Sequence, residues 1–109
     1  MIIAIASLGK KETDKVSPIA GRAPFYLFFK NKKLVKVQKN PFVYGSGGAG
    51  FAVAKMLADE GAEIVITGQL GPNMITALKE KNIKAMMARD MTVKQALEKA
   101  LAGKLERLE

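Results

Sequence analysis

Residues 63–78 read EIVITGQLGPNMITAL, in which a short apolar run is followed at once by a helix start. Residues 64–66 are apolar, and we expect 63–67 to be a buried strand. Pro72 suits the first position of a helix, because it has no amide hydrogen to satisfy there. We expect Ile75 and Leu78 to lie on the buried face of this helix. The stretch therefore predicts a strand, a loop and a helix in immediate succession.

Other strands are predicted on both sides of this unit. Residues 2–6 form a second unbroken apolar run, which we expect to be the central strand. Residues 24–30 and 33–39 read as a hairpin with a tight turn at Asn31 and Lys32. A fifth strand is expected at 83–88.

Two further helices are predicted. The first runs from about 48 to 60 and stops at Gly61, and the helix that Pro72 opens stops at Asn82. Thr92 and Gln95 have the spacing of a capping box, which opens the last helix before Gly103. The residues predicted to form the buried faces of the first and last helices are Phe51, Ala54, Leu57, Ala58, Val93, Ala96, Leu97, Ala100 and Leu101.

The predicted order of elements is βββαβαβα. Right-handed crossovers leave few arrangements, and the favoured one makes the first, fourth and fifth strands parallel, with the hairpin antiparallel on one side. This is an α/β, ribonuclease H-like fold with a mixed five-stranded sheet and three helices. We expect a single domain at 1–103 and a charged C-terminal tail at 104–109.

The loops beyond the carboxyl ends of parallel strands gather at one edge, where ligands normally bind. Here these loops are 7–23, 67–72 and 88–92. The segment GSGGAG at 45–50 joins them, because it opens a helix. It matches the dinucleotide-binding pattern letter for letter, but it lacks a long preceding strand and an acidic residue about 20 positions later.

Two interpretations of the glycine segment stay open. Its glycines at 47, 48 and 50 either allow close packing of the helix against the sheet, or expose helix amides to an anion. Three helix starts are expected at the same edge, which favours an anion. Arg22 either clamps an oxyanion there or forms a surface ion pair. Asp90 argues against an anion.

Composition excludes much chemistry. The chain has 109 residues without cysteine or histidine, so disulfides, thiolate metal sites and the commonest general base are excluded. The strand at 2–6 has no inward aspartate for two-metal nuclease chemistry, and the other carboxylates are scattered. We therefore expect that the protein is not an enzyme. Residues 1–7 lack a basic leader and the length of a membrane span, so we expect a soluble, cytoplasmic protein.

The net charge of +8 is concentrated in residues 1–44, which hold nine Lys or Arg residues and two acidic ones. Aromatic residues interleave with these lysines, a mixture that can bind RNA or an acidic protein. The favoured interpretation is structural: the aromatics fill the core and the lysines protect a strand edge from aggregation. Nucleic acid is therefore an unlikely partner. Its candidate surface is formed by Lys30, Lys32, Lys33, Lys36 and Lys39.

Three segments, 16–29, 54–79 and 91–105, resemble the dinitrogenase iron-molybdenum cofactor biosynthesis family. The motifs are S-P-x-x-G-R-A-P at 17–24 and V-I-T-G-x-x-G-P-N at 65–73. The resemblance covers essentially the whole chain. It implies a ribonuclease H-like domain that binds or carries an anionic iron-sulfur or iron-molybdenum cofactor precursor without turnover. The candidate cofactor-binding residues are Ser17, Gly21, Arg22, Gly45, Gly47, Gly48, Gly50, Thr67, Gly68, Gly71 and Asn73.

The chain departs from the family pattern at one point. Many similar members carry histidine and phenylalanine between the Ser-Pro and the Gly-Arg, and this chain has Ile19 and Ala20. No metal ligand is therefore identified, and Met86, Met87 and Met91 fit a core better than a metal site. Either the cluster is held through backbone amides and Arg22, or cluster binding has been lost.

Two other functions stay open beside the carrier. One is a small-anion or nucleotide-binding regulator that uses the same edge, and the other is docking through the basic hairpin. A donor or acceptor protein for the metal cluster is a possible partner. The chain is expected to be a monomer or a weak homodimer, with no membrane association.

Overall fold

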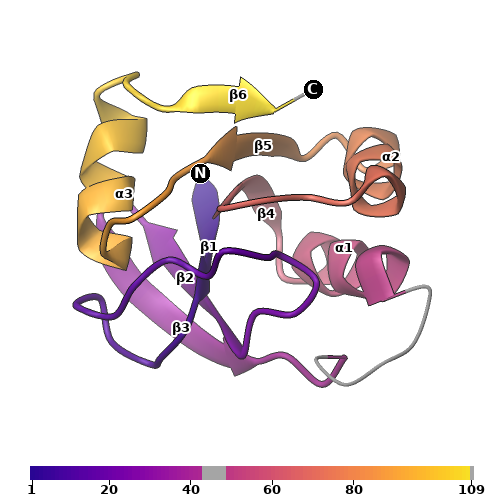
Figure 1. The fold of residues 1–109 in the computed structure, drawn as a ribbon, viewed down its shortest axis with the longest axis horizontal. Helices are drawn as coiled ribbons and strands as arrows, with labels where there is room; N and C mark the ends of the chain where they lie inside the picture. The colour runs from indigo at the N-terminus through magenta and orange to yellow at the C-terminus, as the bar shows by residue number, and fades with distance from the viewer. Residues whose placement is uncertain (43–48, 109) are drawn as a thin grey trace.

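A mixed β-sheet lies between two helices on one face and one helix on the other (Figure 1). The computed structural model describes residues 1–42 and 49–108. In chain order the elements are β1 (Ile2–Ser7), β2 (Phe25–Lys30), β3 (Lys33–Lys39), α1 (Ala49–Asp59), β4 (Ala62–Thr67), α2 (Pro72–Glu80), β5 (Lys84–Met87), α3 (Val93–Leu101) and β6 (Glu106–Leu108).

The strand order is β3-β2-β1-β4-β5-β6. β1 pairs in parallel with β4 and antiparallel with β2, and β4 pairs in parallel with β5. The predicted ribonuclease H-like arrangement, with its antiparallel hairpin beside three parallel strands, is confirmed. Its physical basis is the alternation of strands and helices, which requires crossover connections.

The predicted number of strands was wrong. The described residues form a sheet of six strands, because Glu106–Leu108 pairs antiparallel with β5 instead of lying in a free tail. Gly103 has a φ of +70°, a conformation that suits glycine, and the chain turns back there after α3. The open edge of β5 then supplies the hydrogen-bonding groups that a three-residue strand needs.

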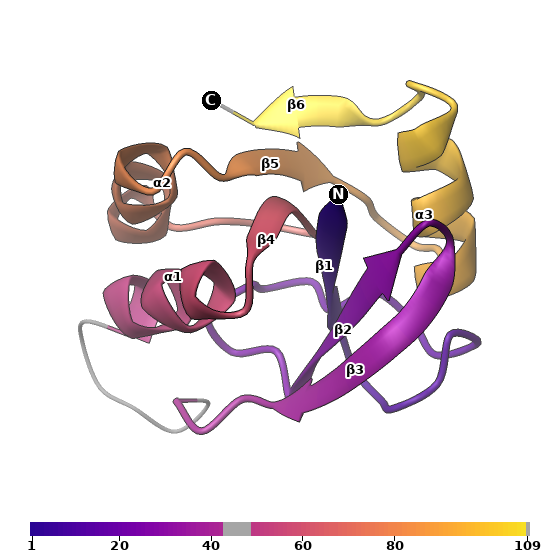
Figure 2. The ribbon, with the colours of Figure 1, turned by 180° about the vertical axis from the view of Figure 1, so that it is seen from behind.

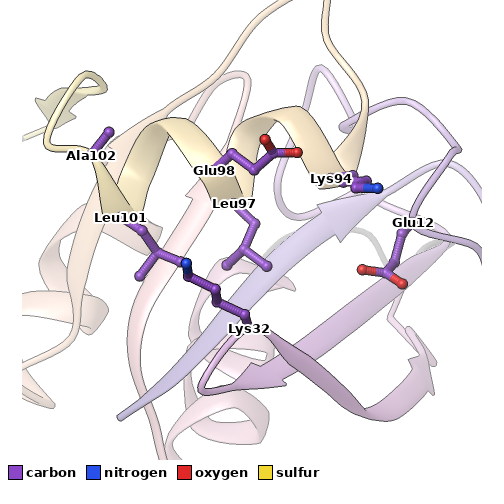
Figure 3. Close-up of a pocket in the computed structure, with 7 residues that line it drawn as sticks. All are labelled: Glu12, Lys32, Lys94, Leu97, Glu98, Leu101 and Ala102. Atoms are coloured by element: carbon purple, nitrogen blue, oxygen red, sulfur yellow. The ribbon is translucent and has the colours of Figure 1, made fainter.

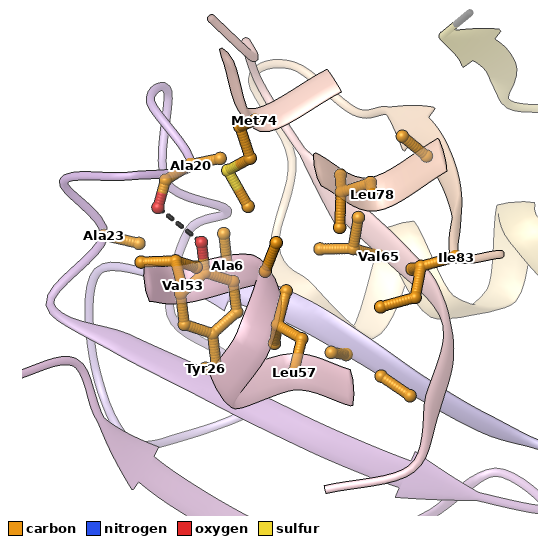
Figure 4. Close-up of a cluster of buried hydrophobic side chains, with 14 of the residues drawn as sticks. Ala6, Ala20, Ala23, Tyr26, Val53, Leu57, Val65, Met74, Leu78 and Ile83 are labelled. Atoms are coloured by element: carbon orange, nitrogen blue, oxygen red, sulfur yellow. Dashed lines mark hydrogen bonds between the residues drawn. The ribbon is translucent and has the colours of Figure 1, made fainter. Parts of the chain in front are cut away.

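Alternation along β1 builds two cores. Ala4 and Ala6 face α1 and α2, where Tyr26, Leu57 and Leu78 are also buried (Figure 4). Ile3 and Ile5 face the opposite side, where α3 covers the sheet. β1 is therefore buried on both faces, as its unbroken apolar sequence predicts.

Most predicted turns and caps are confirmed. Asn31 and Lys32 both have positive φ values in the hairpin turn, and Gly61 and Asn82 have positive φ values after α1 and α2. Thr92 and Gln95 form the capping box of α3.

Two positions predicted to be buried are exposed. Phe51 is 46% exposed, because Val53, Ala54 and Leu57 form the buried stripe of α1. Leu101 is 48% exposed in the last turn of α3.

No helix in residues 1–42 and 49–108 combines the length and the apolar character needed to cross a membrane.

Candidate anion-binding site

The loop that leaves β1 crosses the loop that leaves β4 at the carboxyl edge of the parallel strands. The Gly68 amide donates to the Ser17 carbonyl at 3.0 Å, and the Ala20 amide donates to the Gln69 carbonyl at 3.0 Å. The Ser17 amide also donates to the Ala6 carbonyl at 2.8 Å, which ties the crossing to β1. The two motifs noted in the sequence, at 17–24 and 65–73, are therefore in direct contact.

Gly68 is required at this crossing because the two backbones come very close. A Cβ atom at Gly68 would lie 2.6 Å from Pro18 Cα and 2.7 Å from the Pro18 carbonyl oxygen. Backbone atoms cannot yield as a flexible side chain can, so any larger residue must push the loops apart. The glycine serves close packing here, and its φ is not in the left-handed region.

Buried polar groups hold the first loop from below. The Tyr26 hydroxyl donates to the Ala20 carbonyl (Figure 4). The Asn40 side-chain amide donates to the carbonyls of Gly21 at 3.2 Å and Ala23 at 2.9 Å. Both side chains are almost fully buried, and burial raises the pKa of the Tyr26 phenol far above its ordinary value. The loop is therefore held at several points.

A hollow of about 580 Å³ opens beside the crossing. Its wall comes from all three loops that the strand order predicts at this edge. Ile19 is 50% exposed at the hollow, so an apolar surface faces solvent there. The charged groups are two basic side chains and one acidic one. The principal lining residues are Lys15, Pro18, Ile19, Gly68, Arg89 and Asp90.

The amides at the start of α3 are already used. The Val93 amide donates to the Asp14 carbonyl and the Lys94 amide to the Glu12 carbonyl, each at 2.9 Å. The Gln95 amide donates to Thr92 Oγ1 at 3.2 Å. The expectation that three helix starts offer free amides to an anion was therefore wrong for α3, because the loop from β1 satisfies that helix start.

The starts of α1 and α2 lie against each other on the opposite face of the sheet. A Cβ atom at Gly50 would lie 3.0 Å from Met74 Cβ and 3.1 Å from the Met74 nitrogen. Gly50 thus allows close packing between the two helices, whereas the sequence indicated packing against the sheet. Gly71 precedes α2 without any side-chain cap, and no atom of the described residues lies within 4 Å of a Cβ built on it.

The structure divides the predicted site residues among several places. Ser17 and Gly68 form the crossing, and Gly50, Gly71 and Asn73 lie at the starts of α1 and α2. Gly45, Gly47 and Gly48 lie outside the described residues.

The remaining predicted residues have separate environments. The Thr67 hydroxyl is fully buried, and it has no hydrogen-bond partner among the residues described. The Gly21 carbonyl is bound by Asn40, and Arg22 is exposed and has an interaction of its own.

Sequence reasoning missed Lys15, Ile19 and Arg89 as lining residues. Arg89 directly follows the strand predicted at 83–88, so the rule that predicts ligands at the carboxyl edge could have identified it. Lys15 lies in the long loop between β1 and β2, whose course the sequence does not predict.

The donor atoms do not suit direct metal coordination. No group of three or more His, Cys, Asp or Glu side chains that could hold a metal ion occurs in the described parts of the chain. Iron–sulfur clusters are normally held by thiolate or imidazole, and the sequence has neither cysteine nor histidine. The hollow instead offers an apolar surface and two basic side chains. These groups suit a large, polarizable anion that is bound through its outer atoms, without a bond from the protein to a metal ion.

A second hollow, of about 630 Å³, runs along α3 (Figure 3). Lys32 and Lys94 line it together with Glu12 and Glu98, so its charges are balanced. It lies away from the crossing of the two motifs, and balanced charges give no preference for an anion. The hollow at the carboxyl edge is therefore the better candidate for anion binding.

Comparisons with known proteins give a consistent result. A family model described as dinitrogenase iron-molybdenum cofactor matches residues 1–103. The apo form of the orange protein from Desulfovibrio gigas has a TM-score of 0.93 to this chain at 29% identity, with 98% of this chain and 92% of that chain covered. A putative NifB protein from Thermotoga has a TM-score of 0.86 at 28% identity, with the same coverage of each chain.

A curated sequence is also similar. An uncharacterized protein of Methanocaldococcus jannaschii is 25% identical in an alignment of 105 residues that covers 90% of this chain and 86% of that protein. The similarity to each of these proteins extends over nearly the whole chain.

Proposed function

Because the chain belongs to the dinitrogenase iron-molybdenum cofactor family over residues 1–103, we propose that it is a non-enzymatic carrier of an anionic metal–sulfur cluster. The cargo is an iron-sulfur cluster or an iron-molybdenum cofactor precursor. The protein holds it at the carboxyl edge without bonds from protein ligands to the metal. It therefore receives the cluster from one protein and yields it to another.

One observation carries this proposal: the two motifs that mark the family meet and build the wall of a hollow. Ile19 lies at the hollow, at a position where similar members carry histidine. A binding site at this place therefore fits the family. In this chain an apolar side chain stands in place of the histidine that would coordinate a metal ion.

Charge and polarizability explain how such a site can hold its cargo. A metal–sulfur cluster is large, negatively charged and weakly hydrated. Contact with an apolar wall therefore costs the cluster less desolvation free energy than it would cost a small anion. Lys15 and Arg89 supply positive charge at the rim, and Asp90 opposes it. Exposed charges each contribute little, so we expect weak, reversible binding, which suits transfer.

Anaerobic titration tests the proposal with a synthetic cubane iron–sulfur thiolate cluster and, separately, with isolated iron-molybdenum cofactor. We expect saturable absorption changes and a raised thermal midpoint. The double variant Lys15→Glu/Arg89→Glu should bind about tenfold more weakly. Lys81→Glu/Lys84→Glu is the matched control, because it changes the same charge at exposed positions outside the hollow.

Equal affinity of the two double variants would contradict this site. Stabilisation by nucleotides or phosphate in the absence of metal would instead favour a regulatory module that uses the same edge.

Ile19→His provides a gain-of-binding test. The side chain is half exposed, so the substitution should change stability by less than about 0.5 kcal/mol. An imidazole at the hollow should tighten cluster binding and shift the cluster absorption. Val35→His is the control, because Val35 is 49% exposed and lies on β3 outside the hollow.

A further inference from the structure

β3 lies at one edge of the sheet and is its longest strand, with seven residues (Figure 2). Within the described parts of the chain it pairs only with β2. Both of its faces reach solvent, because Lys36 and Val37 are both exposed and their partners Phe28 and Leu27 belong to opposite cores. Proteins usually shorten or cover an edge strand, because its unpaired backbone groups can bind another chain. β6, at the other edge, has three residues.

The hairpin formed by β2 and β3 is strongly basic. Residues 25–39 contain five lysines and no acidic residue. Lys36 forms an ion pair with Glu60, the residue that follows α1, and Lys36 Nζ lies 2.7 Å from Glu60 Oε1. Lys30, Lys33 and Lys39 are exposed and make no ion pair with the described residues. The edge therefore presents unpaired backbone groups together with positive charge.

These charges oppose pairing with a second copy. An antiparallel pair of β3 strands centred on Lys36 would place Lys36 opposite Lys36 and Lys33 opposite Lys39. Like charges in directly opposite positions destabilise a strand pair. The same charges attract a strand that carries acidic residues. They therefore raise the affinity for an acidic partner relative to that for a second copy, and this difference in affinity is the specificity.

The hairpin is poorly suited to RNA. Single-stranded nucleic acid binds by stacking its bases on exposed aromatic rings. Tyr26, Phe28 and Phe29 are at most 1% exposed, so these rings of β2 cannot stack on bases.

We propose that β3 binds an extended acidic segment of a partner protein, which adds to the sheet as a seventh strand. Main-chain hydrogen bonds supply affinity, and carboxylates near Lys33 and Lys39 supply selectivity. Val37 and Lys39 lie on the α3 side of the sheet, since their partners Leu27 and Phe25 belong to that core. A partner with an apolar residue near Val37 and an acidic one near Lys39 is the best match.

The position of β3 brings such a partner close to the carboxyl edge. β3 is antiparallel to β2 and β2 is antiparallel to β1, so β3 runs in the same direction as β1. Lys39 therefore lies at the end of the sheet where the loops gather. The docking proposal does not depend on the cargo, and either proposal can fail alone.

The test uses the full chain and a fluorescent heptapeptide with glutamate at its first and seventh positions, valine at its third and fifth, and threonine between them. Glutamate and valine two positions apart share one face, as Lys39 and Val37 do. We expect saturable binding that weakens with salt, and slower hydrogen exchange of β3 amides when the peptide is bound. Lys33→Glu/Lys39→Glu should weaken binding about tenfold, whereas Lys81→Glu/Lys84→Glu should leave it unchanged.

A second peptide separates strand pairing from simple charge attraction. It has the same glutamates with proline in place of valine, so it lacks the amide hydrogens at those positions and is disfavoured as a paired strand. Equal binding of both peptides, or unchanged exchange of the β3 amides, would overturn the proposal. Tighter binding of polyuridylate than of the peptide, or a dimer that Lys33→Glu/Lys39→Glu abolishes without any peptide binding, would overturn it too.

Discussion

At the scale of single residues, Gly68 is the position at which sequence most directly determines the site. A side chain there would overlap the backbone of Pro18. We predict that Gly68→Ala destabilises the protein by about 3 kcal/mol, because the two loops must separate. Chemical denaturation measures this change in the free energy of unfolding.

Gly71→Ala is the matched control for this prediction. Gly71 has a φ of −76°, and no described atom would lie within 4 Å of its Cβ. Alanine can adopt this conformation, but Gly71 is the N-cap of α2, where alanine is less favourable than glycine, so we expect a loss of at most about 1 kcal/mol. If the two variants are equally stable, the close crossing of the loops does not constrain residue 68.

Tyr26 links the stability of the fold to pH. Burial raises the pKa of its phenol far above the value of about 10 for a free tyrosine. Below pH 10 both states are protonated, and the stabilising effect of the buried neutral phenol is fully present. Above about pH 10 the unfolded chain loses this proton while the folded chain keeps it, so the free energy of unfolding falls by about 1.4 kcal/mol per pH unit.

Tyr26→Phe isolates this effect when both proteins are denatured between about pH 9 and pH 11. The other ionisable groups are common to both proteins, so the difference in slope belongs to Tyr26. The variant should also lose about 1 to 3 kcal/mol at neutral pH, because the Ala20 carbonyl loses its hydroxyl donor. Parallel pH profiles for the two proteins would contradict the prediction.

The candidate site shows what residue patterns can predict. The sequence placed the loops of Ser17 and Gly68 at the same edge, but it did not predict that their backbones cross in direct contact. Lys15 left no such signal, since any exposed basic residue can lie in a long loop, whereas the position of Arg89 just beyond a parallel strand could have identified it. Phe51 was placed in the core because apolar residues usually are, yet the register of α1 turns it outward.

At the scale of elements, the start of α3 shows how a loop can satisfy a helix. Its first two amides bind carbonyls of the loop from β1, and the third binds Thr92. We predict that Thr92→Ala costs about 1 kcal/mol, as the loss of a helix cap generally does. Hydrogen exchange should become faster at the Gln95 amide and stay slow at Val93 and Lys94.

Thr76→Ala is the control within another helix. The Thr76 hydroxyl donates to the Pro72 carbonyl on an exposed face of α2, so alanine there should be neutral or slightly stabilising. Faster exchange at Val93 in the Thr92→Ala protein would show that the loop contacts depend on the cap.

Strands and helices were predictable to the extent that they bury an apolar face. β1 and β4 contain apolar runs at 2–6 and 64–66, and the capping box of α3 is a local signal. β6 reads Glu-Arg-Leu and has no strand pattern of its own. It forms because β5 offers an open edge, which is a property of the assembled sheet and not of residues 106–108.

At the scale of the whole molecule, the two edges of the sheet differ in kind. The family match ends at residue 103, before β6 begins. β6 covers the edge at β5 with three residue pairs, whereas β3 leaves the opposite edge open over seven residues. The two edges can therefore be changed independently, because the full width of the sheet separates them.

A chain that ends at Gly103 tests whether residues 1–103 fold as a domain without the last strand. We predict that it folds, because both cores are built mainly from residues before Gly103. Loss of a few exposed hydrogen bonds should cost about 2 kcal/mol and lower the thermal midpoint by about 10 °C. Cluster and peptide binding should survive, since neither site includes residues 104–109. An unfolded product would show that β6 is an integral part of the domain, and self-association of the shortened chain would show that its role is to cover the edge of β5.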